Sequence, residues 1–441
     1  MYYSFTYLFL HLKIKIYKFM DTIRIKGGSP LNGEIFISGA KNSALPVLAS
    51  CLLSDKPLHL KNLPNLADIE SMINLLEDLG VEILMDKSKN TATLNAKNIS
   101  KTEASYDIVR KMRASIVVLG PILARMGKVR VSMPGGCSIG ARPVDIHIKG
   151  LIAMGADIKI ENGYIDAVAV NGLHSCEYTL PFPSVTATEN LMMAACFASG
   201  RTVLKNIARE PEIYDLAKCL NSMGASVELN DGNNIVINGV KSPSFNESTH
   251  EILPDRIETG TYAVAALITN GEIRLRNTDI ALIPAFSDKI KEAGASIEIN
   301  DDGFTVKRAS SDIKGVDIMT EPYPGFPTDL QAQKMALMCF CDGSSMITET
   351  IFENRFMHVP ELCRMGADIT IHGSSSLVRG KKSLAGAPVM ATDLRASVSL
   401  VLAALAANGD TLINRIYHLD RGYERLEEKL QNCGAIIERL K

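Results

Sequence analysis

Apolar and polar positions along this chain form one pattern that recurs six times. Each copy ends an amphipathic run with a glycine and continues into a short stretch where apolar and polar residues alternate, as in residues 79–83 (LGVEI). A glycine in this position is typical of a helix C-cap, where a left-handed residue is needed, and the alternation that follows predicts a strand. The six glycines lie 68 to 75 residues apart, at Gly80, Gly155, Gly224, Gly294, Gly366 and Gly434.

A second helix is predicted upstream in each copy. It opens with polar or charged residues and continues as an apolar body, such as residues 400–405 (LVLAAL), which is apolar nearly all round. Such a helix is expected to be buried, whereas a helix like residues 425–430 (RLEEKL) is amphipathic and should face solvent. The six apolar helices open at residues 41–46, 112–115, 184–189, 256–261, 328–332 and 392–397.

Together these elements predict an α/β fold made of six copies of a β-α-β-α-β-β unit. The period is longer than that of the common solenoid repeats. The polar stretch 241–248 (KSPSFNES) divides the copies three and three, so two similar domains with a ligand-binding cleft between them are the simplest architecture. The competing interpretation, six unrelated α/β segments with coincidental spacing, does not explain why both helix types and the glycine recur in register.

Charge and cysteine content narrow the classes of partner. With 47 basic and 49 acidic residues, the chain is not expected to be a general nucleic-acid or membrane-surface binder, and a local site for a small anion remains compatible. The nine cysteines lack paired spacing, which favours a reducing cytoplasm. The eight histidines show no metal-ligand spacing, and neither a metal nor another cofactor is predicted.

Residues 1–19 differ from the rest of the chain. Their apolar run is about ten residues long, too short to span a bilayer, and its lysines follow that run instead of preceding it, unlike a signal peptide. We expect Met20 to begin the working protein and residues 1–19 to be a start-site artefact or a frayed tail.

The stretch 134–143 (PGGCSIGARP) is the first candidate for chemistry. Its glycines allow the backbone to approach a ligand closely, and the positive charge of Arg142 near Cys137 is expected to lower the pKa of the thiol and make it a better acid or nucleophile. The simpler interpretation is a glycine-rich surface turn with an incidental cysteine. Helix openings add positive ends that attract anions, and three of them carry Lys41, Arg113 and Arg395.

Taken in order, the polar motifs of this chain closely resemble those of the UDP-N-acetylglucosamine enolpyruvyl transferases, from about Thr22 to the C-terminus. The resemblance implies an inside-out α/β barrel fold with two domains of three repeats each, in which the N-terminal strand joins the C-terminal half. Domain I is expected to comprise residues 20–40 plus 254–441, and domain II residues 41–253 with the Cys137 loop. The motifs are residues 38–46, 112–115, 134–137, 140–145, 208–212, 253–260, 326–333, 352–356 and 420–425.

The resemblance implies a cytoplasmic transferase of peptidoglycan and cell-wall synthesis, inhibited by fosfomycin. Its reaction moves the enolpyruvyl group of phosphoenolpyruvate to the 3-hydroxyl of UDP-N-acetylglucosamine and releases phosphate. The implied partners are these two small molecules, without nucleic acid, membrane, metal or cofactor. Two alternatives stay open: the sister enzyme that uses shikimate 3-phosphate, and a catalytically weak paralogue that binds a UDP-sugar.

The same resemblance assigns roles to individual residues. Cys137 matches the general acid that protonates the methylene carbon and is alkylated by fosfomycin, and Asp329 matches the base near the sugar hydroxyl, with Lys41 and Arg421 also catalytic. Phosphoenolpyruvate contacts are implied for Lys41, Asn42, Arg142, Arg395 and Arg421. Nucleotide-sugar contacts are implied for Arg113, Arg142, Pro143, Val144, Asp145, Ile146, Ser184, Val185, Asp329 and Ile351, and cleft-lining positions for Glu353 and Asp393.

Several of these residues also have simpler explanations. Asp329 could cap the helix that begins at Leu330, Arg395 could balance Asp393 on the surface, and Arg421 could pair with its neighbour Asp420. Two further residues with ordinary explanations are Asn42, as a turn residue, and His147, as a structural histidine to which no chemistry is assigned.

Two positions depart from the pattern of the family. Thr186 stands where these enzymes commonly have glycine, and a threonine side chain near the uracil pocket is expected to weaken nucleotide binding. The stretch 182–185 (FPSV) lacks a lysine that some members carry there. Neither position is expected to touch the reacting atoms.

Overall fold

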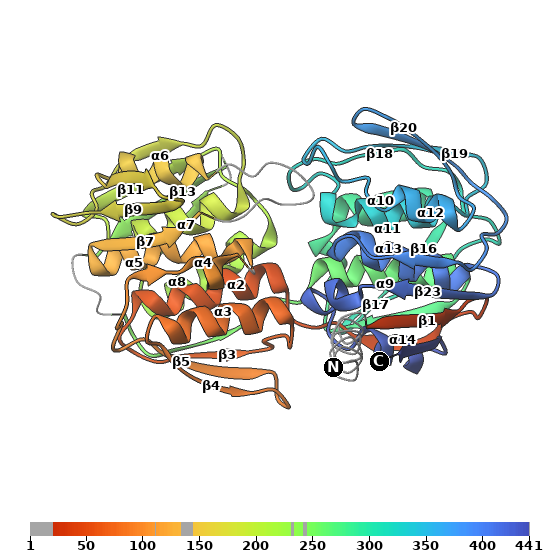
Figure 1. Cartoon of the computed structure of the whole chain (residues 1–441), viewed down its shortest axis with the longest axis horizontal. Coiled ribbons are helices and arrows are strands. Elements are labelled where there is room, and N and C mark those ends of the chain that lie inside the picture. Colours follow the sequence, from red (N-terminus) through yellow and green to blue (C-terminus); the bar gives the residue numbers. More distant parts are fainter. Residues whose placement is uncertain (1–20, 111, 134–143, 231–232, 241–244, 441) are drawn as a thin grey trace, which may run out of the picture. The chain divides into compact units, whose positions relative to one another are not determined.

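The computed structural model describes all residues except 1–20, 111, 134–143, 231–232, 241–244 and 441. The chain divides into two compact units (Figure 1). Unit 1 contains the described residues up to Ile37, Arg256–Glu321 and the residues from Gly325 onwards, and unit 2 contains Ser38–Asp255 with Pro322–Pro324.

Six four-stranded sheets of one topology make up the described strands, three in each unit. In every sheet an edge strand runs parallel to its neighbour, and the remaining two strands follow in antiparallel order. The sheets of unit 2 are β14(Ser248–Glu251)-β3(Leu58–Lys61)-β5(Thr91–Asn95)-β4(Glu82–Asp86), β6(Glu103–Ala104)-β7(Lys128–Ser132)-β9(Tyr164–Val168)-β8(Asp157–Glu161) and β10(Glu177–Thr179)-β11(Gly200–Lys205)-β13(Asn234–Gly239)-β12(Ser226–Asn230).

Unit 1 repeats this arrangement. Its sheets are β2(Asn32–Phe36)-β15(Glu272–Arg276)-β17(Gly303–Arg308)-β16(Ala295–Asn300), β18(Ile318–Met319)-β19(Ser344–Thr348)-β21(Ser375–Arg379)-β20(Asp368–His372) and β22(Pro388–Met390)-β23(Asp410–Asn414)-β1(Thr22–Lys26)-β24(Ile436–Leu440).

Three of the six sheets are completed by a strand from a distant part of the chain. Strand β1 lies between β23 and β24, where Thr22 faces both Asn414 and Leu440, and Figure 1 shows it in red among blue C-terminal elements. Strands β2 and β14 complete the sheets of β15 and β3 in the same way. The prediction of six repeats is therefore confirmed, but only three of them are continuous in sequence. Each of the other three includes a strand from a distant part of the chain, which pairs with strands whose edges would otherwise be open.

Six mostly buried helices form the centres of the two units. In unit 1, α9 is buried along its whole length and packs against α11 and α13, and in unit 2, α7 packs against α2 and α5. This confirms the prediction drawn from their apolar bodies. The helices are α2(Lys41–Ser50), α5(Leu119–Met126), α7(Val185–Ala195), α9(Arg256–Ile268), α11(Gln331–Met338) and α13(Leu394–Ala406).

A second set of six helices is partly exposed. Each is followed by one of the six repeated glycines, whose φ angles lie between +91° and +110°. Because side chains other than glycine rarely adopt such angles, the structure confirms the predicted helix ends. These helices are α3(Ala67–Asp78), α6(Asp145–Ala153), α8(Pro211–Met223), α10(Pro284–Glu292), α12(Val359–Arg364) and α14(Leu426–Asn432).

Short helical turns connect these elements, and two of them open central helices. The 3-10 turn η2 (Arg113–Val118) leads into α5, and η4 (Thr328–Leu330) leads into α11. The remaining short elements are η1(Cys51–Leu53), α4(Tyr106–Val109), η3(Ile280–Leu282) and η5(Ile416–Arg421).

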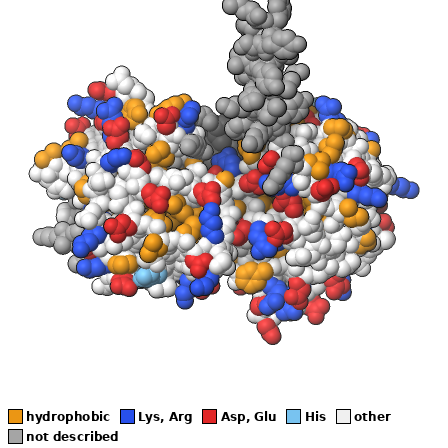
Figure 2. Space-filling view, turned by 60° about the horizontal axis from the view of Figure 1, so that its bottom comes forward, with side chains coloured by type: hydrophobic (Ala, Val, Ile, Leu, Met, Phe, Trp, Pro, Cys, Tyr) orange, Lys and Arg blue, Asp and Glu red, His pale blue; other side chains and the backbone are white. Residues whose placement is uncertain are grey.

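The surface carries charges of both signs. On the face drawn in Figure 2, lysine and arginine side chains are interspersed with aspartate and glutamate, which agrees with the near balance of charge in the sequence. Among the described residues, no helix has the length and apolar character that crossing a membrane requires.

Candidate active site

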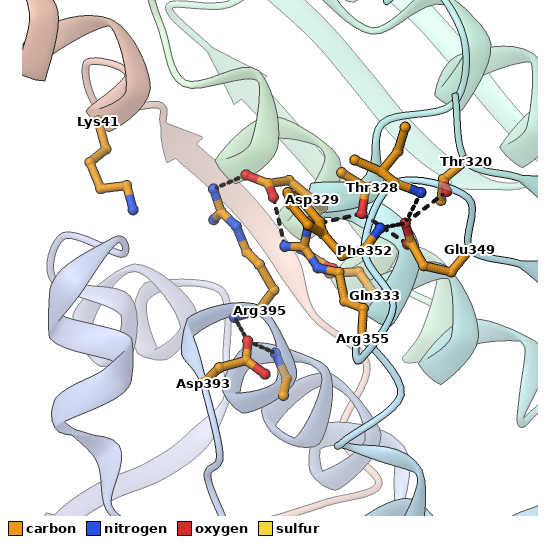
Figure 3. A network of polar contacts seen from close by, with 12 residues as sticks. Lys41, Thr320, Thr328, Asp329, Gln333, Glu349, Phe352, Arg355, Asp393 and Arg395 are labelled. Atoms are coloured by element: carbon orange, nitrogen blue, oxygen red, sulfur yellow. Dashed lines mark hydrogen bonds and ion pairs between the residues drawn. The ribbon is translucent and has the colours of Figure 1, made fainter. Parts of the chain in front are cut away.

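Asp329 lies in η4 and binds two arginines of unit 1 (Figure 3). Its Oδ1 accepts a hydrogen bond from Nη2 of Arg355 at 2.7 Å, and its Oδ2 accepts one from Nη2 of Arg395 at 2.9 Å. Only 5% of each arginine side chain is exposed, against 25% for Asp329. Charge-assisted bonds of this kind fix the direction of the carboxylate. Because α11 has no side-chain cap, the alternative that Asp329 caps this helix is wrong.

Arg395 is the second residue of α13, and its side chain points towards Asp329 (Figure 3). The side chain of Asp393 caps this helix by accepting the backbone N–H groups of Arg395 and Ala396 at 2.9 and 3.0 Å. Arg395 is buried, so the alternative of a surface pair between Arg395 and Asp393 is wrong. The guanidinium of Arg395 adds to the positive end of α13, and together they favour an anion at this position.

Three buried polar side chains support Arg395 and Asp329 from the inside. The hydroxyl of Tyr423 accepts a bond from Nη1 of Arg395 at 3.2 Å. Gln333 donates from Nε2 to the backbone oxygen of Asp329 at 2.9 Å and lies 3.3 Å from the Tyr423 hydroxyl. Thr261, on α9, is 3.0 Å from the same hydroxyl. The three central helices of unit 1 therefore share one polar network around the arginine.

Arg355 belongs to the cluster around Asp329, although no role was predicted for it from the sequence. It donates to the Thr328 hydroxyl at 2.9 Å as well as to Asp329, and its guanidinium lies 5.2 Å from the centre of the Phe352 ring. The only signal for it in the sequence was its place in the stretch 352–356 (FENRF).

Glu349 is a second missed residue, and it organises the loop that carries Ile351. Its Oε1 accepts from the Thr320 hydroxyl at 3.0 Å and from the backbone N–H of Ile351 at 2.9 Å. Its Oε2 accepts from the Thr328 hydroxyl at 2.8 Å, so the loop is tied to η4 (Figure 3). The predicted contact residues Ile351 and Glu353 lie on this loop, partly and largely exposed respectively.

Arg421 is the last residue of η5 in unit 1. Its neighbour Asp420 is bound through both carboxylate oxygens by Arg439, at 2.7 and 3.1 Å. The alternative that Asp420 serves as the ion-pair partner of Arg421 therefore finds no support in these contacts.

Two histidines of unit 1 contribute no charge near neutral pH. Burial lowers the pKa of His358 to about 4, an effect that the nearby Arg355 reinforces and Asp393 opposes. Burial also lowers the pKa of His418, with Arg421 acting in the same direction. The positive charge of this region therefore comes from arginines.

Lys41 and Asn42 open α2 in unit 2. The Nζ of Lys41 lies 3.3 Å from Oδ2 of Asp68, and its backbone N–H donates to Asp255 at 3.3 Å. Ser43, in the same first turn, is fully buried, and its hydroxyl donates a hydrogen bond to the carboxylate of Asp215. Because Asn42 lies in the first turn of a helix, the alternative of an ordinary turn residue is wrong.

His147, on α6, binds two residues of α7, the helix that Ser184 and Val185 precede and open. Its Nδ1 lies 2.9 Å from Nδ2 of Asn190, and its Nε2 lies 3.5 Å from the hydroxyl of Thr186. Burial lowers the pKa of His147 to about 4, and the charge of Arg113 adds to the effect while that of Asp145 opposes it. The imidazole is therefore neutral and buried, as expected of a structural histidine.

The other predicted nucleotide-sugar residues differ in exposure. Val144 and Ile146 are buried at the start of α6, whereas Asp145 is exposed and pairs with Lys149 at 3.0 Å. Ser184 and Val185 open α7 and are partly exposed. Three further predictions, Cys137, Arg142 and Pro143, lie outside the described residues.

Within the described part of the chain, no group of three or more histidine, cysteine, aspartate or glutamate side chains could hold a metal ion.

Comparison with known proteins defines the class. The family model of EPSP synthase (3-phosphoshikimate 1-carboxyvinyltransferase) matches residues 25–430. The fold is similar to that of the enolpyruvyl transferase NikO from Streptomyces tendae, with a TM-score of 0.86 and 23% identity over 95% of this chain and 99% of that one. EPSP synthase from Acinetobacter baumannii gives a TM-score of 0.74 at 18% identity, over 96% of this chain and all of that one. The chain therefore belongs to the EPSP synthase family of enolpyruvyl transferases, which confirms the predicted fold class.

Curated relatives narrow the position within this family. UDP-N-acetylglucosamine 1-carboxyvinyltransferase from Rhodospirillum centenum is 58% identical over 431 residues, covering 96% of this chain and 99% of the relative. The enzyme of the same name from Granulibacter bethesdensis is also 58% identical and is covered completely. The sequence resemblance to this group is thereby confirmed.

Proposed function

We propose that this protein transfers the enolpyruvyl group of phosphoenolpyruvate to the 3-hydroxyl of UDP-N-acetylglucosamine and releases phosphate. This would be the first committed step of peptidoglycan synthesis and would take place in the cytoplasm. The names of relatives that are 58% identical over nearly the whole chain support this assignment. Among the contacts of the structure, the strongest support is the carboxylate of Asp329 between two buried arginines.

Asp329 acts as the base in this proposal. Arg355 fixes one of its oxygens, and Arg395, which binds the other, is assigned to the negatively charged phosphoenolpyruvate. When the substrate takes over Arg395, Oδ2 loses this partner and can accept the proton of the sugar hydroxyl. A base must lie within hydrogen-bond reach of the proton that it removes, and the bond to Arg355 keeps the carboxylate in one orientation during this exchange.

The chemistry is an addition followed by an elimination. The hydroxyl oxygen forms a bond to C2 of phosphoenolpyruvate while Cys137 gives a proton to C3, which yields a tetrahedral ketal. Loss of a proton from C3 then restores the double bond as the bond between C2 and the phosphate oxygen breaks. The role of Cys137 comes from the sequence motif, since this residue lies outside the described part of the chain.

Cations hold the two charged groups of phosphoenolpyruvate. We assign this role to Lys41, Arg142, Arg395 and Arg421, with Asn42 beside Lys41. Arginine suits carboxylate and phosphate because its forked donors bind two oxygens at once. The pairing of Lys41 with Asp68 keeps the ammonium group compensated until an anion replaces the aspartate.

The nucleotide sugar is assigned to polar and apolar residues near helix openings. The charges of Arg113, at the start of η2, and of Asp145, on α6, both act on His147, and Thr186 on α7 lies 3.5 Å from its Nε2, which supports a shared role in binding. Pro143, Ile351 and Glu353 stay in the proposal as contact or cleft residues. Thr186 is expected to reduce nucleotide affinity, because its hydroxyl and methyl groups occupy space beside this histidine.

The sister reaction with shikimate 3-phosphate is the second candidate, favoured by the description of the matching family model. Its weakness is that the EPSP synthase structures are only 18% to 19% identical to this chain. Phosphate release from phosphoenolpyruvate should be measured with each acceptor in turn. Release with UDP-N-acetylglucosamine alone is expected; release with shikimate 3-phosphate alone would move the assignment, and release with neither would favour a UDP-sugar-binding paralogue.

A further inference from the structure

Arg439 joins three segments of unit 1 through one guanidinium. On strand β24, it donates two bonds to the carboxylate of Asp420, at 2.7 and 3.1 Å, and a third from Nε to Glu427 at 2.5 Å. Asp21, just before β1, lies 3.8 Å from the same group. The arginine side chain is 28% exposed and Glu427 is 16% exposed. The guanidinium therefore connects η5, α14 and the start of β1 at once.

The segment that Arg439 holds has an unusual backbone. Nine described residues other than glycine have positive φ angles, and seven of them are asparagine. The other two are Arg415 and Arg425, with φ angles of +61° and +50°, at the two ends of residues 415–425. Asparagine adopts this conformation readily, but arginine does so at a cost in free energy. Contacts elsewhere must therefore keep this segment in place.

Arg421 lies in the middle of the segment, next to Asp420. In a 3-10 helix successive side chains point about 120° apart, so a fixed Asp420 also fixes the direction in which Arg421 leaves the backbone. We propose that Arg439 is a positioning residue, which sets the place of Arg421 for phosphoenolpyruvate by holding Asp420 and Glu427. The proposal rests on the proposed function and adds a residue outside its substrate contacts.

A purely structural role for Arg439 would give a different result. Loss of an ion pair that only stabilises this sheet would lower the stability of the protein and would not change KM for one substrate more than for the other. The pair of Arg24 and Glu438 provides the comparison, because it joins β1 to the same strand β24 at 2.9 Å and is more than half exposed. Within the described part of the chain, no hydrogen bond or ion pair of these two side chains reaches residues 415–425, so Arg24→Met is the matched control for Arg439→Met.

The experiment measures steady-state phosphate release together with hydrogen exchange of residues 415–425. For Arg439→Met we expect faster exchange in this segment and a loss of kcat/KM for phosphoenolpyruvate of up to about 100-fold, with little change in KM for UDP-N-acetylglucosamine. Arg439→Lys should restore part of the activity, because it keeps the charge without the fork. Asp420→Asn should resemble Arg439→Met, and the double variant should be little worse than either.

Each outcome decides between the possibilities. Arg24→Met should leave kinetics and exchange of the segment unchanged. Unchanged hydrogen exchange of residues 415–425 in Arg439→Met would overturn the bracing of this segment. Equal changes of KM for the two substrates would overturn the positioning of Arg421 for phosphoenolpyruvate. If the unaltered protein releases no phosphate with UDP-N-acetylglucosamine, both the proposed function and the positioning role are wrong. If the unaltered protein and Arg439→Met are equally active, only the positioning role is wrong.

Discussion

At the scale of single residues, a sequence motif names the residues of the candidate site but does not say which of them pair in the folded chain. Asp329 and Arg395 were predicted from their motifs, and the structure places them 2.9 Å apart. Arg355 was missed, because nothing in the pattern of the sequence says that an arginine at position 355 turns inward to meet an aspartate 26 residues earlier. Long-range pairing of this kind depends on how η4 and the loop after β19 meet in the folded unit.

Arg355→Met should therefore reduce activity even though the residue has no predicted substrate contact. Without it, the Asp329 carboxylate keeps Arg395 as its arginine partner and loses its fixed direction, and a misplacement of about 1 Å can lower a rate by about 100-fold. We expect a fall in kcat of this order, measured by phosphate release. Arg364→Met, which removes the pair between the exposed Arg364 and the largely buried Glu361 on α12, is the control. Equal activity of the two variants would remove Arg355 from the site.

Cys137→Ser should abolish or severely reduce turnover and remove sensitivity to fosfomycin. A serine hydroxyl is a far weaker acid than a thiol and does not provide the nucleophile that the inhibitor alkylates. The measurement is phosphate release with and without preincubation with fosfomycin. A fully active and fosfomycin-resistant serine variant would refute the acid role, and alkylation of another cysteine, located by mass spectrometry, would refute Cys137 as the target.

At the scale of secondary-structure elements, the repeat was predictable and its completion was not. The six glycines and the apolar helices were visible in sequence because left-handed helix ends and full burial restrict residue type. Strands β1, β2 and β14 could not be assigned to their sheets in this way, because strand pairing depends on which edges are open in the folded chain. Only the family resemblance indicated that the N-terminal strand joins the C-terminal half.

The pairing of β1 makes a specific prediction about truncation. A chain that starts at Met20 keeps β1 whole and should retain activity and thermal stability. A chain that starts at Gly28 loses β1 and opens both β23 and β24, which pair with it residue by residue. Thermal unfolding and phosphate release should both show loss of the folded, active protein for the shorter chain. Equal stability of the two chains would contradict the assigned role of β1.

Two buried histidines, His147 and His358, are expected to make the folded protein less stable in acid. The pKa values of His147 and His358 are about 4, below the ordinary value of 6.5, so the folded state binds fewer protons than the unfolded state between these limits. The stability that each neutral imidazole contributes, about 3 kcal/mol at most, is present above pH 6.5 and is lost as the pH falls towards 4.

Urea unfolding at pH 7.5 and pH 5 measures this loss. His358→Gln should make the free energy of unfolding less dependent on pH between these values, because the variant no longer carries the buried imidazole that the folded state keeps neutral. Equal pH dependence in the unaltered protein and in His358→Gln would show that this imidazole does not remain neutral in the folded state.

At the scale of the whole molecule, a repeated scaffold carries a small set of charged residues. In the proposed function, each unit contributes residues at the openings of its central helices: Lys41 and Asn42 on α2, Asp329 before α11 and Arg395 on α13. At the opening of a buried helix, a polar side chain lies beside backbone N–H groups that have no partner within the helix. Both can therefore bind the same anion. The near-neutral net charge of the chain therefore does not prevent local binding of anions.

The most direct test of this account is to identify the product. The purified protein should be incubated with phosphoenolpyruvate and UDP-N-acetylglucosamine, and the mixture analysed by mass spectrometry while phosphate is counted. The account predicts a nucleotide sugar that has gained one carboxyvinyl group on its 3-oxygen for every phosphate released. An unmodified nucleotide sugar, or phosphate released without any such product, would contradict it.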